Sequence, residues 1–311
     1  MERETSRLEL IMSKRTSSAT FSLIVCTLGR MDQLRTLFDS LCVQNYSGFE
    51  IVVVDSNAPG FLKDVIDSYR PKLKIVHVLA GLGLAAARNV GLIHATGDIV
   101  AFPDDDCWYE PNTLANALNK FKGQDSLAIV SGRTVDQEGK PSVSLFLEQP
   151  AQISRKNYLK CGNSASIFYR RAVFADIGRF DIRLGVSSGT EFQSGEESDI
   201  LLRALDAGLT AQFFPDLLIY HGQVDSALTD AHIRRARTYG LGFGALLRKH
   251  RFPVSQLAYR VGRALLGSML YLVLGKFLLA RYRWTWGRAI LDGYRHWPPA
   301  NERLSFERIN A

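Results

Sequence analysis

The sequence has few cysteines, and none of them forms a recognisable pair. The four are scattered through 311 residues without a Cys-x-x-Cys motif: Cys26, Cys42, Cys107 and Cys161. This spacing outlines neither a disulfide framework nor a zinc site, and it is typical of small buried thiols in a reducing cytosol. The first twenty residues lack the apolar run that follows the basic start of a secretory signal. We therefore expect a cytoplasmic protein with a polar leader at residues 1–20.

Internal repeats and low-complexity linkers are also absent, which excludes solenoids and long tethered arrays. The hydrophobic content of 46% and the charged content of 22% are ordinary for a folded protein. A chain of this length can bury a substantial core. We expect one large domain, or one domain with an appendage.

Acidic residues are scarce in the last part of the chain. From Ser226 to Ala311 there are 15 Lys and Arg but only 4 Asp and Glu, whereas the whole chain carries +7. This asymmetry predicts that the tail faces a polyanion, either nucleic acid or an anionic membrane. The same tail holds the apolar run Ala264–Ala280, which nucleic-acid binding does not explain. We therefore expect an anionic membrane surface as a partner, and no nucleic acid.

Short apolar runs alternate with stretches of helical spacing in the first 122 residues. The apolar runs are Phe21–Cys26, Glu50–Asp55, Leu73–Leu79 and Asp98–Phe102. The stretches with helical spacing lie near 31–43, 60–70, 83–95 and 111–122. This alternation predicts an α/β fold with a mostly parallel sheet flanked by helices, similar to a Rossmann fold. Ligands of such sheets bind at the carboxyl ends of the strands.

The pattern is less regular beyond residue 140. We expect strands at Ser164–Tyr169 and Ala211–Phe214, and a helix at Glu196–Ala207. From about Thr229 onward the chain is basic, aromatic and mostly helical in pattern.

An acidic triplet, Asp104-Asp105-Asp106, directly follows the apolar strand that ends at Phe102. In an extended chain Asp104 and Asp106 point to the same side. Two carboxylates placed this way suit a divalent cation that takes oxygen ligands and leaves positions for substrate phosphates. The alternative is a solvated acidic turn, or a cap for the helix that begins near Pro111.

Two further polar residues lie near predicted strand ends. Asp55 closes an apolar strand, where its carboxylate is suited to accept hydrogen bonds from a nucleobase or ribose, or to serve in a turn. Arg88 lies in a probable helix, where its guanidinium suits a diphosphate, although it has the alternative of an ordinary surface arginine.

Acidic residues also open the predicted helix at 196–207. Glu196 and Glu197 either complement the helix dipole or supply a general base for an acceptor hydroxyl. His221 follows the apolar run Asp216–Tyr220 and is either a structural histidine or a third metal ligand.

In order and context, these motifs resemble family 2 glycosyltransferases with the GT-A fold. The resemblance covers Phe21 to His221, about two-thirds of the chain. The segments that carry it are Thr27–Arg30, Glu50–Ser56, Gly83–Gly97 with Ala87-Arg88-Asn89 inside it, the Asp104–Asp106 signature, Gly178–Asp181 and Gly195–Asp199.

The resemblance implies a metal-dependent, inverting enzyme that moves a sugar from a UDP- or GDP-sugar to a hydroxyl. It implies a GT-A domain at 21–225, with a nucleotide-binding part at 21–106 and an acceptor part at 107–225. Glu197 takes the position of the catalytic base, with Glu196 beside it, and Mg²⁺ or Mn²⁺ is held by Asp104, Asp106 and His221. The implied donor-binding residues are Thr27, Arg30, Asp55, Arg88, Asp104 and Asp105.

Four positions depart from the family pattern. Cys26 and Gly29 replace the usual proline and asparagine of the opening segment, and Ser56 replaces a common second aspartate. The base motif, which usually reads Glu-Asp, here reads Glu196-Glu197. The extra methylene shifts the carboxylate that register assigns as the base.

The tail at 226–311 resembles the helical segment of family members that build polysaccharides at membranes. Arginines bracket Ala264–Ala280, and three tryptophans follow it, which is typical of a segment that lies in a membrane interface. The alternative is a helix packed on the catalytic domain or on a partner subunit. We expect peripheral binding to the cytosolic leaflet and a glycan or lipid-linked acceptor.

Two rival functions remain open from the sequence. The stretch Gly81–Ala86 fits Gly-x-Gly-x-x-Ala, the outline of a dinucleotide-binding loop in an NAD-dependent oxidoreductase. The altered base motif also permits a non-catalytic membrane-bound scaffold.

Overall fold

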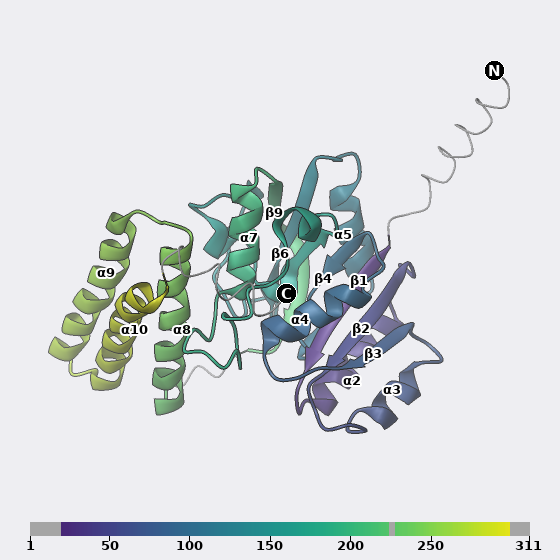
Figure 1. Ribbon diagram of the computed structural model, residues 1–311, viewed down its shortest axis with the longest axis horizontal. Helices are drawn as coiled ribbons and strands as arrows, with labels where there is room; N and C mark the ends of the chain where they lie inside the picture. Colours follow the sequence, from purple (N-terminus) through teal and green to yellow (C-terminus); the bar gives the residue numbers. More distant parts are fainter. Residues whose placement is uncertain (1–19, 224–227, 299–311) are drawn as a thin grey trace, which may run out of the picture.

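The computed structural model describes residues 20–223 and 228–298 (Figure 1). The leader expected at 1–20 lies outside the described residues except for Thr20. The first half of the chain alternates between strands and helices as the sequence predicts. Its elements are β1 (Phe21–Thr27), α2 (Met31–Cys42), β2 (Phe49–Asp55), α3 (Lys63–Tyr69), β3 (Ile75–Leu79), α4 (Leu84–His94) and β4 (Ile99–Ala101).

The second half carries the two longest strands, three short strands and two 3-10 turns before the tail. Its elements are β5 (Cys107–Trp108), α5 (Thr113–Phe121), β6 (Leu127–Val135), β7 (Ala151–Gln152), η2 (Tyr158–Lys160), η3 (Ser164–Ser166), β8 (Ile167–Arg170), α6 (Val173–Ile177), α7 (Glu196–Asp206) and β9 (Thr210–His221).

The nine-stranded sheet is parallel in its first part and mixed beyond it. Four strands pair in parallel in the order β3-β2-β1-β4. β8 then lies antiparallel between β4 and β6, β9 is parallel to β6, and β5 and β7 pair antiparallel with β9. The parallel arrangement predicted from the strand–helix alternation therefore holds for 21–106, and later strands add antiparallel pairs.

Helices cover both faces of the sheet because the inner strands are apolar on both sides. One buried cluster joins α2, α3 and α5 to one face, through residues such as Leu37 and Val53. The other joins α4, α7 and the last turns of α8 (Asp230–Lys249) to the opposite face, through residues such as Val54 and Ile200. The carboxyl ends of β1, β2 and β4 consequently meet at one edge of the sheet.

Two strands differ from their predicted bounds. The chain from Ser164 to Ser166 forms a 3-10 turn with a capping box from Asn163, so β8 begins only at Ile167. β9 extends well past the predicted 211–214 because its register shifts between Phe213 and Leu218, a stretch that contains a proline. A proline cannot donate to a ladder, and such an irregularity lets the strand continue past it.

The tail forms three helices: α8 (Asp230–Lys249), α9 (Val254–Val273) and α10 (Phe277–His296). The apolar run Ala264–Ala280 does not form a single helix. The run is interrupted at Gly275, whose φ of 67° lies in the left-handed region that glycine adopts without strain. The apolar run is therefore the end of one helix, a turn, and the start of the next.

Glycines let α8 and α10 pack closely against each other. A Cβ at Gly244 would lie 2.1 Å from the Ile290 carbonyl oxygen, and one at Gly293 would lie 2.0 Å from the Leu241 carbonyl oxygen. No larger residue fits at these two positions, which explains the glycine-rich stretch of α8. Among the described residues, no helix has the length and apolar character needed to cross a bilayer.

Candidate active site

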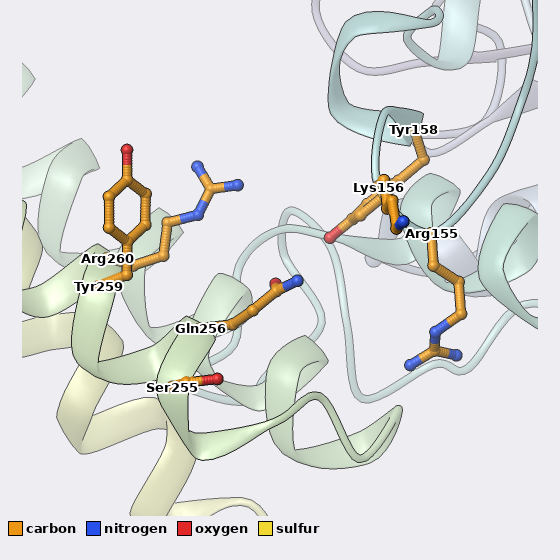
Figure 2. Close-up of a pocket in the computed structure, with 7 residues that line it drawn as sticks. All are labelled: Arg155, Lys156, Tyr158, Ser255, Gln256, Tyr259 and Arg260. Atoms are coloured by element: carbon orange, nitrogen blue, oxygen red, sulfur yellow. The ribbon is translucent and has the colours of Figure 1, made fainter.

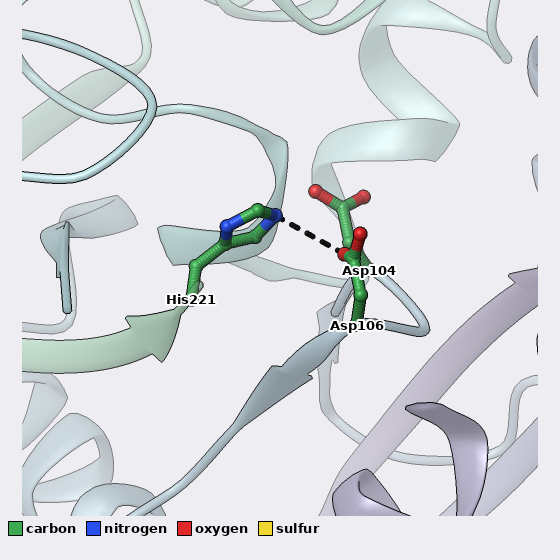
Figure 3. Close-up of side chains that lie close together, drawn as sticks. All are labelled: Asp104, Asp106 and His221. Carbon is green, nitrogen blue, oxygen red and sulfur yellow. Dashed lines mark ion pairs between the residues drawn. The ribbon is translucent and has the colours of Figure 1, made fainter. Parts of the chain in front are cut away.

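Three side chains that are far apart in the sequence converge at the carboxyl edge of the sheet. Asp104 and Asp106 follow β4, and β5 begins directly after them. Cys107 in β5 pairs with His221, the last residue of β9, which brings that histidine beside the aspartates. One ligand atom from each of Asp104, Asp106 and His221 lies within 4.8 Å of the others. Figure 3 shows the imidazole facing the two carboxylates.

The hydrogen bonds around this cluster orient it for a cation. His221 Nδ1 lies 2.7 Å from the Gly222 carbonyl oxygen, which can only accept, so Nδ1 carries the hydrogen. Nε2 then faces Asp106 Oδ1 at 3.1 Å. That oxygen is buried and has no hydrogen-bond partner within the described residues. Two carboxylates and an imidazole, with one buried oxygen unsatisfied, fit a divalent cation such as Mn²⁺ or Mg²⁺.

Charge interactions within the cluster shift the pKa values of its members. The Asp106 carboxylate raises the pKa of His221. Burial works to raise the pKa of Asp106, but the nearby imidazole and Arg30 outweigh it and lower that pKa. Burial raises the pKa of Asp104, and the Asp106 charge adds to the effect. The cluster therefore holds negative charge on Asp106, opposite His221.

Arg30 lies against the acidic triplet rather than apart from it. Its Nη1 donates to Asp105 Oδ1 at 3.0 Å and also contacts Asp106 Oδ2. Asp105 is buried, with an exposed fraction of 6%, and Thr27 is buried at the end of β1. The predicted donor-binding residues Thr27, Arg30 and Asp105 are thus gathered at one strand edge.

Arg88 is buried, so its interpretation as an ordinary surface arginine is wrong. Its exposed fraction is 2%, and its guanidinium lies 3.0 Å from Glu196 Oε1 and 3.6 Å from Asp104 Oδ1. The rings of Phe102 and Phe180 lie 5.7 and 5.5 Å from it. We call Asp104, Asp106 and His221 the metal-type cluster. Arg88 links this cluster to the acidic start of α7.

Asn89 connects two motifs that are about ninety positions apart. Its side-chain amide donates to the Phe180 carbonyl oxygen at 2.9 Å, and its Oδ1 accepts from the Phe180 N–H at 2.8 Å. The Gly178–Asp181 segment is therefore fixed against α4. Asp181 itself points away and pairs with Lys249 at 2.7 Å.

The two glutamates at the start of α7 lie in different surroundings. Glu196 is held by Arg88, whereas no ion pair within the described residues involves Glu197, whose carboxyl group contacts Glu196 instead. Burial raises the pKa of Glu197 well above its ordinary value, and the Glu196 charge adds to this. A carboxyl group with a raised pKa and no cationic partner suits proton transfer near neutral pH.

Contacts with the tail hold the start of α7 in place. Asp199 is fully buried and lies 2.6 Å from Lys249 Nζ and 2.8 Å from His250 Nε2. Arg203, one turn further along α7, pairs with it at 3.0 Å. Trp297 is also buried, against Phe192. The end of α8 and Trp297 therefore pack on the catalytic domain.

Asp55 ends β2 as predicted, but its carboxylate is completely buried. Oδ1 accepts hydrogen bonds from the backbone and side chain of Asn57, at 2.8 and 2.7 Å. Oδ2 lies 3.0 Å from His77 Nε2 on β3. In this structure Asn57 and His77 therefore stand between Asp55 and solvent.

Sequence reasoning missed the residues that line the cavity next to the cluster. A cavity of about 300 Å³ is bounded by Asp106, His221, Trp108 from β5, and Gln33 and Thr36 from α2. Trp108 stacks on Tyr220 with ring centroids 5.7 Å apart. The position of Trp108, two residues after Asp106, was the available signal. For Gln33 and Thr36 on α2 the sequence contains no such signal, because the pattern of an amphipathic helix does not show which of its polar residues face a ligand.

Comparison with known proteins agrees with this geometry. A model of glycosyl transferase family 2 matches residues 22–178, about half of the chain. EpsH of Bacillus subtilis (strain 168) is 26% identical over 170 residues, covering 49% of this chain and 47% of that protein. A PGL/p-HBAD biosynthesis glycosyltransferase of Mycobacterium bovis (strain BCG / Pasteur 1173P2) is 28% identical over 176 residues, covering 55% of this chain and 67% of that one. The chain thus spans about half of the first relative and two-thirds of the second.

Solved structures share the fold over most of the chain. The mannosyltransferase PcManGT from Pyrobaculum calidifontis, in complex with GDP-Man and Mn²⁺, aligns with a TM-score of 0.60 and 20% identity, over 91% of this chain and 88% of that one. S. aureus TarS 1–349 in complex with UDP-GlcNAc aligns with a TM-score of 0.55 and 18% identity, over 89% and 91%. None of these proteins is an oxidoreductase, and Gly81–Ala86 follows β3 at the sheet edge. The chain is a glycosyltransferase with the GT-A fold and belongs to glycosyl transferase family 2.

Proposed function

We propose that this glycosyltransferase is metal-dependent and inverting, and that it uses a UDP- or GDP-sugar and a glycan or lipid-linked acceptor at the cytosolic face of a membrane. One observation carries the proposal. Asp104, Asp106 and His221 form a cluster suited to a divalent cation, and Arg88 joins that cluster to the glutamates of α7. The proposed donor site at the metal-type cluster therefore adjoins the proposed catalytic base at the start of α7.

The donor side is built from residues at the strand ends. Asp104, Asp106 and His221 would hold Mg²⁺ or Mn²⁺, which would offset the charge that develops on the leaving diphosphate. Asp55 orients Asn57 and His77 toward the nucleobase. Arg30, Thr27 and Asp105 complete the nucleotide side, and Arg88 is positioned to contact the diphosphate.

Glu197 takes the proton from the acceptor hydroxyl. Glu196 is committed to Arg88, so Glu197 is the carboxyl group that remains available at the start of α7. The hydroxyl then attacks the anomeric carbon from the face opposite the leaving nucleotide, and the configuration inverts. The neighbours that bind GDP-Man with Mn²⁺ and UDP-GlcNAc support a nucleotide-sugar donor and a divalent metal.

The hairpin of α9 and α10 supports peripheral membrane binding. Large apolar side chains are exposed at its turn, with exposed fractions of 84% for Val273 and 71% for Phe277. Leu266, Met269, Leu270, Leu272 and Leu274 are also exposed there. Exposed apolar groups on a basic segment match an anionic membrane interface.

The hairpin turn lies at the same end of the helical bundle as the start of α8 (Figure 1). Arg281, in the first turns of α10, pairs with Asp230 at the start of α8 at 2.9 Å. Asp230 follows His221 by nine residues, so the start of α8, which contacts the hairpin, is close along the chain to the metal-type cluster. This arrangement supports an acceptor that is presented at the membrane.

A transfer assay tests the proposed function. Purified protein is incubated with UDP- and GDP-sugars, Mn²⁺ or Mg²⁺ and membrane lipid extract, and the anomeric configuration of the product is read by NMR. We expect product with inverted configuration, and loss of turnover with EDTA that added metal restores. Retained configuration, or full turnover in EDTA, would contradict the proposal.

A further inference from the structure

A second cavity lies between the catalytic domain and α9, apart from the residues assigned to the donor. Its volume is about 230 Å³. Arg155, Lys156 and Tyr158 line it from the domain, and Ser255, Gln256, Tyr259 and Arg260 line it from the first turns of α9. Figure 2 shows the two groups facing each other across the space. Neither the metal-type cluster nor the glutamates of α7 lines it.

The cavity carries positive charge that the protein does not neutralise. Arg155 is committed, because its guanidinium pairs with Asp206 and donates to the His250 carbonyl oxygen, both at 2.6 Å. The side chains of Lys156 and Arg260, by contrast, make no ion pair or hydrogen bond within the described residues. Arg260 has only a ring contact, with Phe243 at 5.6 Å. Two cations in one concave site favour an anionic ligand.

The Tyr158 hydroxyl is a donor without a partner in the described part of the chain, at the wall of the cavity. Tyr158 has an exposed fraction of only 5%, and its ring stacks on Phe252. Its hydroxyl makes no hydrogen bond in the described part of the chain and points into the cavity, toward the Gln256 amide (Figure 2). Burial raises its pKa, so the hydroxyl keeps its proton and can donate. A donor that faces the cavity and has no partner in the protein is available to a ligand atom.

The start of α9 adds a third favourable contribution. Ser255 and Gln256 lie in the first turn of a twenty-residue helix whose N-cap, Pro253, provides no side-chain hydrogen bond. The Gln256 N–H already donates to the Pro253 carbonyl oxygen at 2.9 Å, so the contribution that remains is the positive end of the helix dipole, which favours negative charge.

We propose that this cavity binds a phosphate group. A phosphate has acceptor oxygens for Arg260, Lys156, the Tyr158 hydroxyl and the Gln256 amide at once. Tyr259, which is 61% exposed, lies on the cavity rim and on α9, whose exposed apolar residues continue toward the hairpin turn. The phosphate source is therefore either a phospholipid headgroup at the membrane or a soluble phosphate compound.

The test is a ³¹P NMR titration of inorganic phosphate into the full-length protein without metal or nucleotide. We expect saturable binding that weakens about tenfold in Arg260→Gln and in Tyr158→Phe. Tyr158→Phe removes only an unpaired hydroxyl, so its melting temperature should match that of the wild type. Arg263→Gln is the matched control, because it removes the same charge from α9 outside the cavity lining.

Vesicle sedimentation separates the two sources of phosphate. With phosphatidylcholine vesicles that contain phosphatidic acid, a headgroup site predicts that Tyr158→Phe and Arg260→Gln lose retention and that Arg263→Gln loses less. A site for a soluble compound predicts equal retention of Arg260→Gln and Arg263→Gln, with the NMR loss unchanged. Both results support the cavity as a phosphate site.

Two results would overturn the proposal. One is phosphate binding that is equal in the wild type, Arg260→Gln and Tyr158→Phe. The other is weakening in Arg263→Gln as large as in Arg260→Gln, which would indicate diffuse charge. Phosphate binding should persist in Asp106→Asn, so failure here is distinguishable from failure of the proposed metal-dependent donor site.

Discussion

The surroundings of the metal-type cluster bury charged side chains, whereas the α9–α10 hairpin exposes apolar side chains. At the strand edge, charged groups such as Arg88 and Glu196 are buried at 2% and 5% exposure. At the hairpin, large apolar groups such as Val273 and Phe277 are exposed. Burying charge and exposing apolar surface both cost stability, so each departure indicates a site kept for function. The first predicts chemistry on a charged substrate, and the second predicts docking to an apolar surface.

The largest effect that sharpens this comparison is expected from Glu197→Gln. Removing the proposed general base should lower kcat by about 10²- to 10⁴-fold and leave nucleotide affinity unchanged. Steady-state kinetics together with donor binding by calorimetry measure both quantities. The proposed role of Glu197 would be excluded by full turnover, or by an equal loss of donor affinity.

The two glutamates of α7 should differ in their effect on stability. Glu196→Gln removes the charge partner of buried Arg88 and should lower the free energy of unfolding by about 1–3 kcal/mol. Glu197→Gln removes a carboxylate whose raised pKa shows that its charge is unfavourable, so it should raise stability at neutral pH and above. Urea denaturation of both variants measures this. A change of the same sign in the free energy of unfolding of both variants would contradict the different roles assigned to Glu196 and Glu197.

At the hairpin we expect loss of membrane binding without loss of fold. The double variant Val273→Ser, Phe277→Ser should weaken retention on anionic vesicles by about tenfold or more, because two exposed apolar side chains no longer enter the interface. Its melting temperature and nucleotide binding should stay at wild-type values. Ala258→Ser, at an exposed position near the other end of α9, is the control. If the double variant were retained on vesicles as well as the control, the hairpin would not be the membrane-binding surface.

The smallest effect is a pH dependence with opposite signs for turnover and stability. The pKa of Glu197 is raised in the folded protein, so the folded state holds a proton that the unfolded chain has released. Stability should therefore fall as pH rises from the ordinary glutamate pKa toward the raised value. Over the upper part of that range kcat/KM should rise, because the base acts in its deprotonated form. A kcat/KM profile that falls over this range would contradict the role of Glu197.

The sequence could predict much of the first half because its signals are local. A strand such as Ile51–Val54 with a polar residue at its end already indicates a ligand edge. The 90-residue separation of Asn89 and Phe180, and the approach of His221 to Asp106 through β5 and β9, depend on pairing that no local pattern contains. The commitment of Glu196 to Arg88 likewise emerges only from tertiary contacts.

The structure of the tail could be predicted less well from the sequence than that of the first half. Its composition indicates basic and apolar character, but Gly275 divides the apolar run, and Gly244 and Gly293 set how closely α8 and α10 pack. A glycine in a sequence does not show whether it breaks a helix or allows close contact. The cavity at Tyr158 was equally unpredictable, since its walls come from segments about a hundred residues apart.

The most direct test of the central claim is calorimetric titration of UDP, GDP and their sugars, with Mn²⁺ or Mg²⁺ and then without metal. We predict that one nucleotide binds only with metal, and that Asp106→Asn abolishes this binding while its melting temperature stays close to that of the wild type. Equal affinity with and without metal, or unchanged binding in Asp106→Asn, would contradict a metal-dependent donor site at Asp104, Asp106 and His221.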